Sequence, residues 1–245
     1  MLNTKALMST IDYLREHTPR ESIPVNSKVI ELIDPGHGGI INDVYTTYPR
    51  KMYNHGPKAY EVGNPMVFYE GVWTRAIAWL YAADLYANGL GYYIVAPGHT
   101  DYGRTERCIR ANHFNAKVKK KGIRTYYHSI HGNGYGVESV NGIEVYTSPG
   151  QTLSDPIATE MYYKLEELLG WRMRPGLGDG DPDKEAKFTV LVRTHMPAVL
   201  SEVGFYTNFE ECVNMLSLSN MSLIIQAFRE THEIVIHKDL LKPMV

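Results

Sequence analysis

From Lys28 onward, short β-rich runs alternate with long helical patterns, and this alternation constrains the fold more than any other feature of the chain. The runs typical of strands are "KVIELI", "YYIVA", "IRTYYHSI", "GIEVYT" and "PAVLSEV". Helical periodicity covers Glu70 to Asn88, Arg104 to Lys119, Leu153 to Leu169 and about Ser219 to His237. Such alternation predicts a sheet with helices on both faces. We expect an α/β fold with a twisted, largely parallel or mixed sheet in a single domain.

The N-terminal segment has a different pattern. Residues 4–17 predict a short amphipathic helix, with Leu7, Ile11 and Leu14 on one side, and the segment "HTPRESIP" with its two prolines ends it. We therefore expect a helical extension over residues 1–27 and the main domain over residues 28–245. A chain of 245 residues with 44% hydrophobic content can bury a full core.

Composition excludes several classes of protein. A formal net charge of -2 gives no basic field, so we expect no nucleic-acid partner. The two cysteines, Cys108 and Cys212, form no CxxC pair and are expected to be reduced. The chain has no apolar run of about 18 residues, and its N-terminus lacks the pattern of a signal peptide. We expect no transmembrane segment, synthesis in the cytoplasm and a monomer.

Four polar residues lie where ligand sites collect in open α/β sheets, at the carboxyl ends of strands. His37 follows the first strand in "IDPGHGG", His131 ends "TYYHSIH", and Glu202 closes "PAVLSE". Glu70 begins the helix that follows the first long loop. Two imidazoles and a carboxylate are a frequent zinc set, which in catalytic sites leaves one coordination position open for water. The fourth residue would then be a base.

Each residue also has a structural interpretation. His37 fits a turn histidine that tolerates an unusual backbone angle, and Glu70 fits an acidic helix N-terminus favoured by the helix dipole. His131 and Glu202 fit such interpretations less well, because charged groups are rarely buried without partners.

Taken together, these segments resemble the zinc-dependent N-acetylmuramoyl-L-alanine amidases called type 3 amidases. The similar segments occur in order: "IDPGHGG", Glu70 with "RAIAWLYAADLYANGLGYYIV", "RCIRAN" with "SIHGNG", and "PAVLSEVGFYTN". The resemblance spans about Lys28 to His237, so it makes the main domain a zinc amidase catalytic domain. By position it implies that His37, Glu70 and His131 bind Zn²⁺ and that Glu202 activates the water.

The resemblance also implies the substrate, which is peptidoglycan, and the bond, which is the amide between the lactyl group of N-acetylmuramic acid and L-alanine. Without a recognisable signal peptide, the chain is expected to be a phage or prophage lysis enzyme that acts on the cell wall after release. Two alternatives remain open. One is an inactive or regulatory wall-binding module, and the other is a zinc peptidase or deacetylase that acts on another amide.

The chain departs from the usual pattern of this family at two places. The segment "APGHTD" lacks the arginine that members commonly carry after the second strand, and a long insertion precedes Glu70. The insertion makes Glu61 a rival ligand, but the distance from Glu70 to "GLGYYIV" fits a helix of about five turns at 3.6 residues per turn. His128 is a rival to His131. Because residues three apart in a strand point to opposite faces, only one of them can face the metal, and the Gly-Asn-Gly after His131 favours that residue.

Other polar residues are weaker candidates. Arg193 and His195, just before the Glu202 strand, are candidate substrate contacts, although they equally fit an exposed surface pair. The insertion from Asn42 to Phe68 is rich in Gly, Pro and Asn, and we expect it to form one wall of the substrate cleft. Its tyrosines suit stacking on sugars or packing of the insertion onto the domain. They are Tyr45, Tyr48, Tyr53 and Tyr60.

Overall fold

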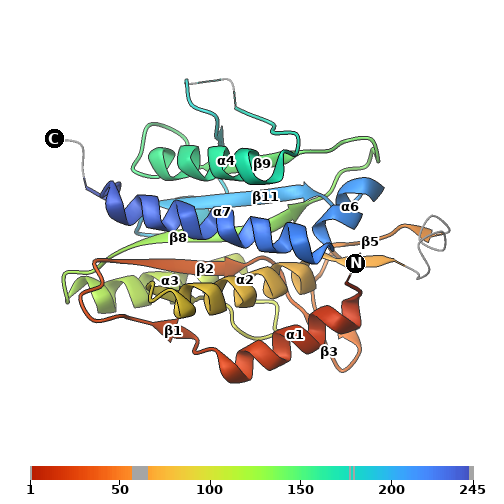
Figure 1. Cartoon of the computed structure of the whole chain (residues 1–245), viewed down its shortest axis with the longest axis horizontal. Helices are drawn as coiled ribbons and strands as arrows, with labels where there is room; N and C mark the ends of the chain where they lie inside the picture. Colours follow the sequence, from red (N-terminus) through yellow and green to blue (C-terminus); the bar gives the residue numbers. More distant parts are fainter. Residues whose placement is uncertain (1, 57–65, 177, 179, 243–245) are drawn as a thin grey trace.

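A computed structural model describes residues 2–56, 66–176, 178 and 180–242 (Figure 1). The helices are α1 (Thr4–His17), α2 (Glu70–Ala87), α3 (Arg104–Lys119), α4 (Asp155–Leu169), α5 (Thr189–Val192), α6 (Phe209–Met215) and α7 (Leu218–His237). The strands are β1 (Glu21–Ser22), β2 (Val29–Pro35), β3 (Ile40–Ile41), β4 (Val44–Tyr45), β5 (Met52–Asn54), β6 (Val67–Tyr69), β7 (Tyr92–Ile94), β8 (Arg124–Asn133), β9 (Ile143–Thr147), β10 (Lys184–Glu185) and β11 (Ala198–Phe205).

One seven-stranded sheet, ordered β1-β7-β2-β8-β11-β9-β10, forms the centre of the fold. Strands β7, β2, β8 and β11 run parallel, whereas β9 runs antiparallel to β11 and β1 antiparallel to β7. Every residue of β2 is buried, because helices cover both faces of this central strand. The predicted α/β class is confirmed, and the sheet is mixed.

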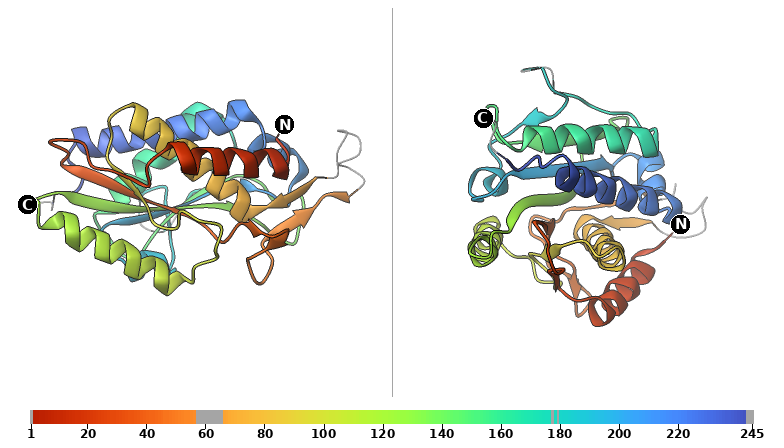
Figure 2. Two further views of the ribbon diagram at one scale, coloured as in Figure 1. Left: turned by 90° about the horizontal axis from the view of Figure 1, so that it is seen from below. Right: turned by 60° about the vertical axis from the view of Figure 1, so that its left-hand side comes forward.

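Helices cover the two faces unequally (Figure 2). Helices α2, α4 and α7 pack on one face over the larger hydrophobic core, and α3 and α5 pack on the other face over a smaller one. Helix α2 is apolar on nearly all sides because α1 and α7 flank it while it lies on the sheet. Its first residue, Glu70, lies at the carboxyl ends of the central strands β2 and β8.

The N-terminal extension packs against the main domain. Leu7 and Ile11 on one side of α1 are buried in the larger core, and α1 lies against α2. Strand β1 then adds an edge strand to the sheet. Residues 4–27 therefore share the core and the sheet of the rest of the chain.

The insertion between β2 and α2 contains two small antiparallel sheets, β3 with β4 and β5 with β6. Residues 57–65 lie outside the described residues, and with them Glu61 and Tyr60. Both cysteines are buried and free. Within the described part of the chain, no helix is both long enough and apolar enough to cross a membrane.

Candidate metal centre

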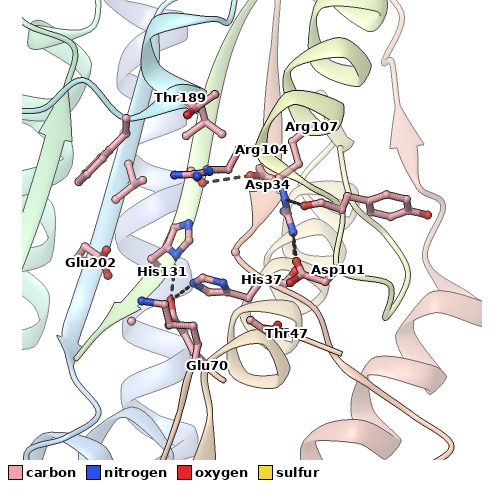
Figure 3. A pocket seen from close by; sticks show the side chains of 18 of the residues that line it. Asp34, His37, Thr47, Glu70, Asp101, Arg104, Arg107, His131, Thr189 and Glu202 are labelled. Carbon is pink, nitrogen blue, oxygen red and sulfur yellow. Dashed lines mark hydrogen bonds and ion pairs between the residues drawn. The ribbon is translucent and has the colours of Figure 1, made fainter. Parts of the chain in front are cut away.

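Three predicted ligands converge at the carboxyl ends of β2 and β8 (Figure 3). His37 Nε2 lies 3.1 Å from Glu70 Oε1, and His131 Nδ1 lies 3.0 Å from the same oxygen. One donor atom from each residue falls within 4.8 Å of the others. The residues come from the turn after β2, the first turn of α2 and the end of β8, so the fold brings together positions far apart in the chain.

This donor set fits a zinc ion. Donors about 2.0–2.1 Å from a tetrahedral centre are roughly 3.3 Å apart, close to the separations of Glu70 Oε1 from the two imidazole nitrogens. Burial alone would raise the pKa of Glu70, but His37 and His131 outweigh it and hold that pKa at about 2. The side chain of Glu70 is 3% exposed, whereas those of His37 and His131 are 21% and 18% exposed. The centre therefore has an ionised carboxylate at its base and an open side.

His37 occupies its turn in an unusual backbone conformation, with φ at +61°. This left-handed region is uncommon for residues other than glycine, so neighbouring contacts must hold the turn. A Cβ atom on the preceding Gly36 would lie 2.4 Å from the His131 ring. Gly36 is thus required for the close approach of the two imidazoles, whose centroids are 5.0 Å apart.

Two buried arginines hold this turn, and the sequence interpretation did not identify either role. Arg75 Nη2 and Arg107 Nη2 donate to the carbonyl oxygen of His37 at 2.6 and 2.5 Å. Arg107 also donates to Asp34 Oδ1 at 2.6 Å, which fixes its guanidinium behind the ligands. For Arg75, its place among the apolar residues of the middle of α2 was the available signal, since charged residues are rarely fully buried without a role.

Arg75 is fully buried, and burial lowers its pKa to about 9. Besides His37, it donates to backbone oxygens of Gly36, Gly71, Gly98 and Thr100. Gly98 and Thr100 lie in "APGHTD", the segment that lacks the arginine common in the resembling family. An arginine on α2 therefore ties that segment to the His37 turn.

Glu202 lies on β11 in register with His131 on β8 and with Glu144 on β9. Its Oε2 atom is buried and finds no hydrogen-bond partner in the described part of the chain. Burial raises the pKa of Glu202 to about 8, with the charge of Glu70 adding to the effect. A buried carboxylate oxygen without a partner is costly, and such groups concentrate at functional sites.

His128, the rival of His131, lies on the opposite face of the sheet. Its Nδ1 is 2.9 Å from Glu31 Oε1, its Nε2 is 2.9 Å from Ser201 Oγ, and its ring edge contacts Phe228 of α7. The arrangement resembles a Ser-His-Glu triad. All three of its members are fully buried, so a substrate cannot reach them.

A cavity of about 490 Å³ opens over the ligands and Glu202. The insertion forms one wall with Thr47, Tyr48, Pro49 and Lys51. The opposite wall contains Tyr102, Arg104, Phe188, Thr189 and Val190. The predicted cleft wall is thus present in the residues described.

The structure places Arg193 and His195 away from this cavity. Both follow α5 and are exposed, and Asn112 holds their backbone through hydrogen bonds to Arg193 O and from His195 N. His195 lines a separate surface pocket with Ser148 and Thr194. The chain turns after α5, so the preceding residues, Phe188 to Val190, face the cavity instead.

Comparison with known proteins identifies the family. The profile of the N-acetylmuramoyl-L-alanine amidases matches residues 32–231, which is most of the chain. The chain belongs to this family and therefore to an enzyme class that hydrolyses amides in peptidoglycan. No curated protein has a matching sequence.

Solved structures show the same fold. An N-acetylmuramoyl-L-alanine amidase from Clostridium difficile 630 is 21% identical with a TM-score of 0.66, over 87% of this chain and 98% of that one. The catalytic domain of the amidase CwlV from Bacillus (Paenibacillus) polymyxa var. colistinus is 22% identical with a TM-score of 0.61, over 88% and 99%. The amidase Ami1 from Mycobacterium smegmatis is 19% identical with a TM-score of 0.60, over 84% and 98%.

Proposed function

We propose that this chain is a zinc-dependent hydrolase that cuts the amide between the lactyl group of N-acetylmuramic acid and L-alanine in peptidoglycan. The observation that carries the proposal is Glu202, which lines the same cavity as the three candidate ligands and has a carboxylate oxygen without a hydrogen-bond partner among the described residues. Family membership supplies the reaction class, and the donor set supports zinc.

His37, Glu70 and His131 would hold the ion. When bound, zinc supplies Lewis acidity, which lowers the pKa of a water molecule toward neutrality and polarises a carbonyl group. Arg75 and Arg107 position His37 through its carbonyl oxygen. Gly36 allows His131 to lie against the turn.

Glu202 moves the proton. In its deprotonated form Glu202 accepts a proton from the attacking water, and it then donates that proton to the leaving amine, which is a very poor leaving group unless it is protonated. Neighbouring strands present Glu202 and His131 side by side on one face of the sheet, so the base and the ligand are fixed by backbone pairing. The site then needs no movement of the main chain to align them.

The decisive experiment is digestion of purified peptidoglycan followed by mass spectrometry. We expect released stem peptides with a free L-alanine at the N-terminus, because only the amidase cut produces them. Products cut between two amino acids would indicate a peptidase, and sugars that lose only acetyl groups would indicate a deacetylase. An intact polymer that still binds the protein would indicate a wall-binding module.

As biological setting we propose lysis by a phage or prophage, with the enzyme made in the cytoplasm and acting on the wall after release. Expression inside bacteria should then lyse the cells only when a membrane-permeabilising protein is produced with it. Lysis by the enzyme alone would contradict this setting and leave the chemistry untouched.

Tyr48 should contribute to binding of polymeric substrate. It is 93% exposed and lines the cavity, whereas Tyr45 and Tyr53 are held by hydrogen bonds to Lys51 O and Glu138. Tyr48→Ala should raise KM for polymeric peptidoglycan by about fivefold, the value of one aromatic contact, and change KM for a small muramoyl-peptide less. Kinetics on both substrates measure this.

The control is Tyr163→Ala, which removes a tyrosine that is 53% exposed on α4, outside the residues that line the cavity. If Tyr48→Ala raised KM equally for the two substrates, Tyr48 would support the site itself. Its proposed role at the rim of the cavity would then have to be abandoned.

A further inference from the structure

The two walls of the cavity differ in chemistry. The insertion wall carries the exposed side chains of Tyr48 and Lys51. The opposite wall, which we call the α3 wall, combines the apolar residues Phe188 and Val190 with Tyr102, just before α3, and with Arg104, the first residue of α3. A substrate that is a sugar on one side of the bond and a peptide on the other would meet two different surfaces.

Arg104 is the cation on the α3 wall whose side chain is exposed to the cavity. Its side chain is exposed, lines the cavity, and has neither a hydrogen bond nor an ion pair with any residue the structure describes. In Figure 3, Arg104 and Thr189 lie at one end of the cavity and Glu70 and Thr47 at the other, with the two ligand histidines between them. Its guanidinium is therefore free to bind a group that enters with the substrate.

The acids nearby do not satisfy Arg104. Asp34 lies 2.6 Å from Arg107 Nη1, and Asp101 lies 3.6 Å from Arg107 Nη2. Asp34 also accepts hydrogen bonds from Tyr127 and Ser129. Arg107 thus contacts both acids, whereas Arg104 forms an ion pair with neither of them.

Lys51 is the second cation of the cavity and the natural rival. It lies on the insertion wall, and its charge acts on Glu202, whose pKa it lowers against the larger effect of burial. Lys51 is thus coupled to the proposed base. Arginine, in addition, presents the planar pair of donors that matches a carboxylate, which a lysine ammonium does not.

We propose that Arg104 binds a carboxylate of the stem peptide, and that the peptide half of the substrate therefore lies along the α3 wall with the sugar half along the insertion. This inference rests on the proposed function. Its chemical target is the α-carboxyl group of the acidic residue that follows L-alanine, because that group is the first free anion on the peptide side of the bond. Phe188 and Val190 offer the apolar surface for the alanine methyl group.

The test uses two muramoyl tripeptides with amidated C-termini that differ at one group. The second residue is D-glutamate in one and D-isoglutamine in the other, so only the first has a carboxylate at the target position. The wild-type enzyme should have a kcat/KM about tenfold higher for the D-glutamate tripeptide than for the D-isoglutamine tripeptide. The difference should come mainly from KM, as expected for one charge-assisted hydrogen-bonded pair. Arg104→Gln should bring this ratio close to one, and Arg104→Lys should retain part of it.

Lys51→Gln is the matched control, since it removes the other cation of the same cavity and should keep the preference for the acid. Equal cleavage of both tripeptides by the wild type, or an unchanged preference in Arg104→Gln, would overturn the inference and leave the amidase reaction intact. Loss of the preference in Lys51→Gln alone would place the peptide on the insertion wall. If the wild type releases no L-alanine peptide from either compound, the proposed function itself fails.

Discussion

Replacing Glu202 with glutamine should lower turnover on peptidoglycan by about 10²-fold or more while the zinc content stays at one ion per chain. Glutamine keeps the shape of the side chain but cannot accept a proton from water. Glu202 Oε2 has no hydrogen-bond partner within the described residues, so the substitution removes no hydrogen bond of that atom there. Turnover measured by release of stem peptides, together with metal analysis of the same preparation, tests both parts.

Glu144→Gln is the control for this experiment. Glu144 is in register with Glu202 on the adjacent strand, but Arg174, Lys184 and Tyr146 all contact its carboxylate. Its charge is engaged in a structural cluster, so turnover per folded molecule should stay within a few-fold of wild type. A Glu202→Gln enzyme that cleaves at the normal rate would remove Glu202 from the mechanism.

Local patterns predicted most of the architecture because each element carries its own period. Helix α3 spans Arg104–Lys119 as predicted, and α1 spans Thr4–His17. The convergence of the candidate ligands could also be predicted, since His37 lies just after β2 and His131 near the end of β8, and these two strands are parallel neighbours in the sheet.

Contacts between elements that are far apart in the chain could not be predicted from local sequence patterns. The roles of Arg75 and Arg107 depend on where α2 and α3 lie against the His37 turn, and no spacing along the chain encodes that. Arg193 and His195 lie outside the cavity for the converse reason. They lie close to Glu202 in sequence, but the turn after α5 directs them to the surface.

A second prediction compares the two histidines of β8, His131 and His128. His131→Ala should lose zinc, because it removes one of three ligands from a centre in which Glu70 and His37 alone complete only half of a tetrahedral set. Its fold should survive, since the side chain is 18% exposed at the cavity. Metal analysis after dialysis, with thermal unfolding of the same sample in the presence of a chelator, separates metal loss from unfolding.

His128→Ala should have the opposite effect. Removing this imidazole leaves the fully buried Glu31 Oε1 without its contact to His128 Nδ1 and Ser201 Oγ without its contact to His128 Nε2, which should cost about 3 kcal/mol in the free energy of unfolding. The proposed zinc ligand His131 lies on the other face of the sheet, so folded molecules should keep their metal. If His128→Ala lost zinc while it remained folded, or if His131→Ala kept a full complement, the assignment of His131 as the ligand would be wrong.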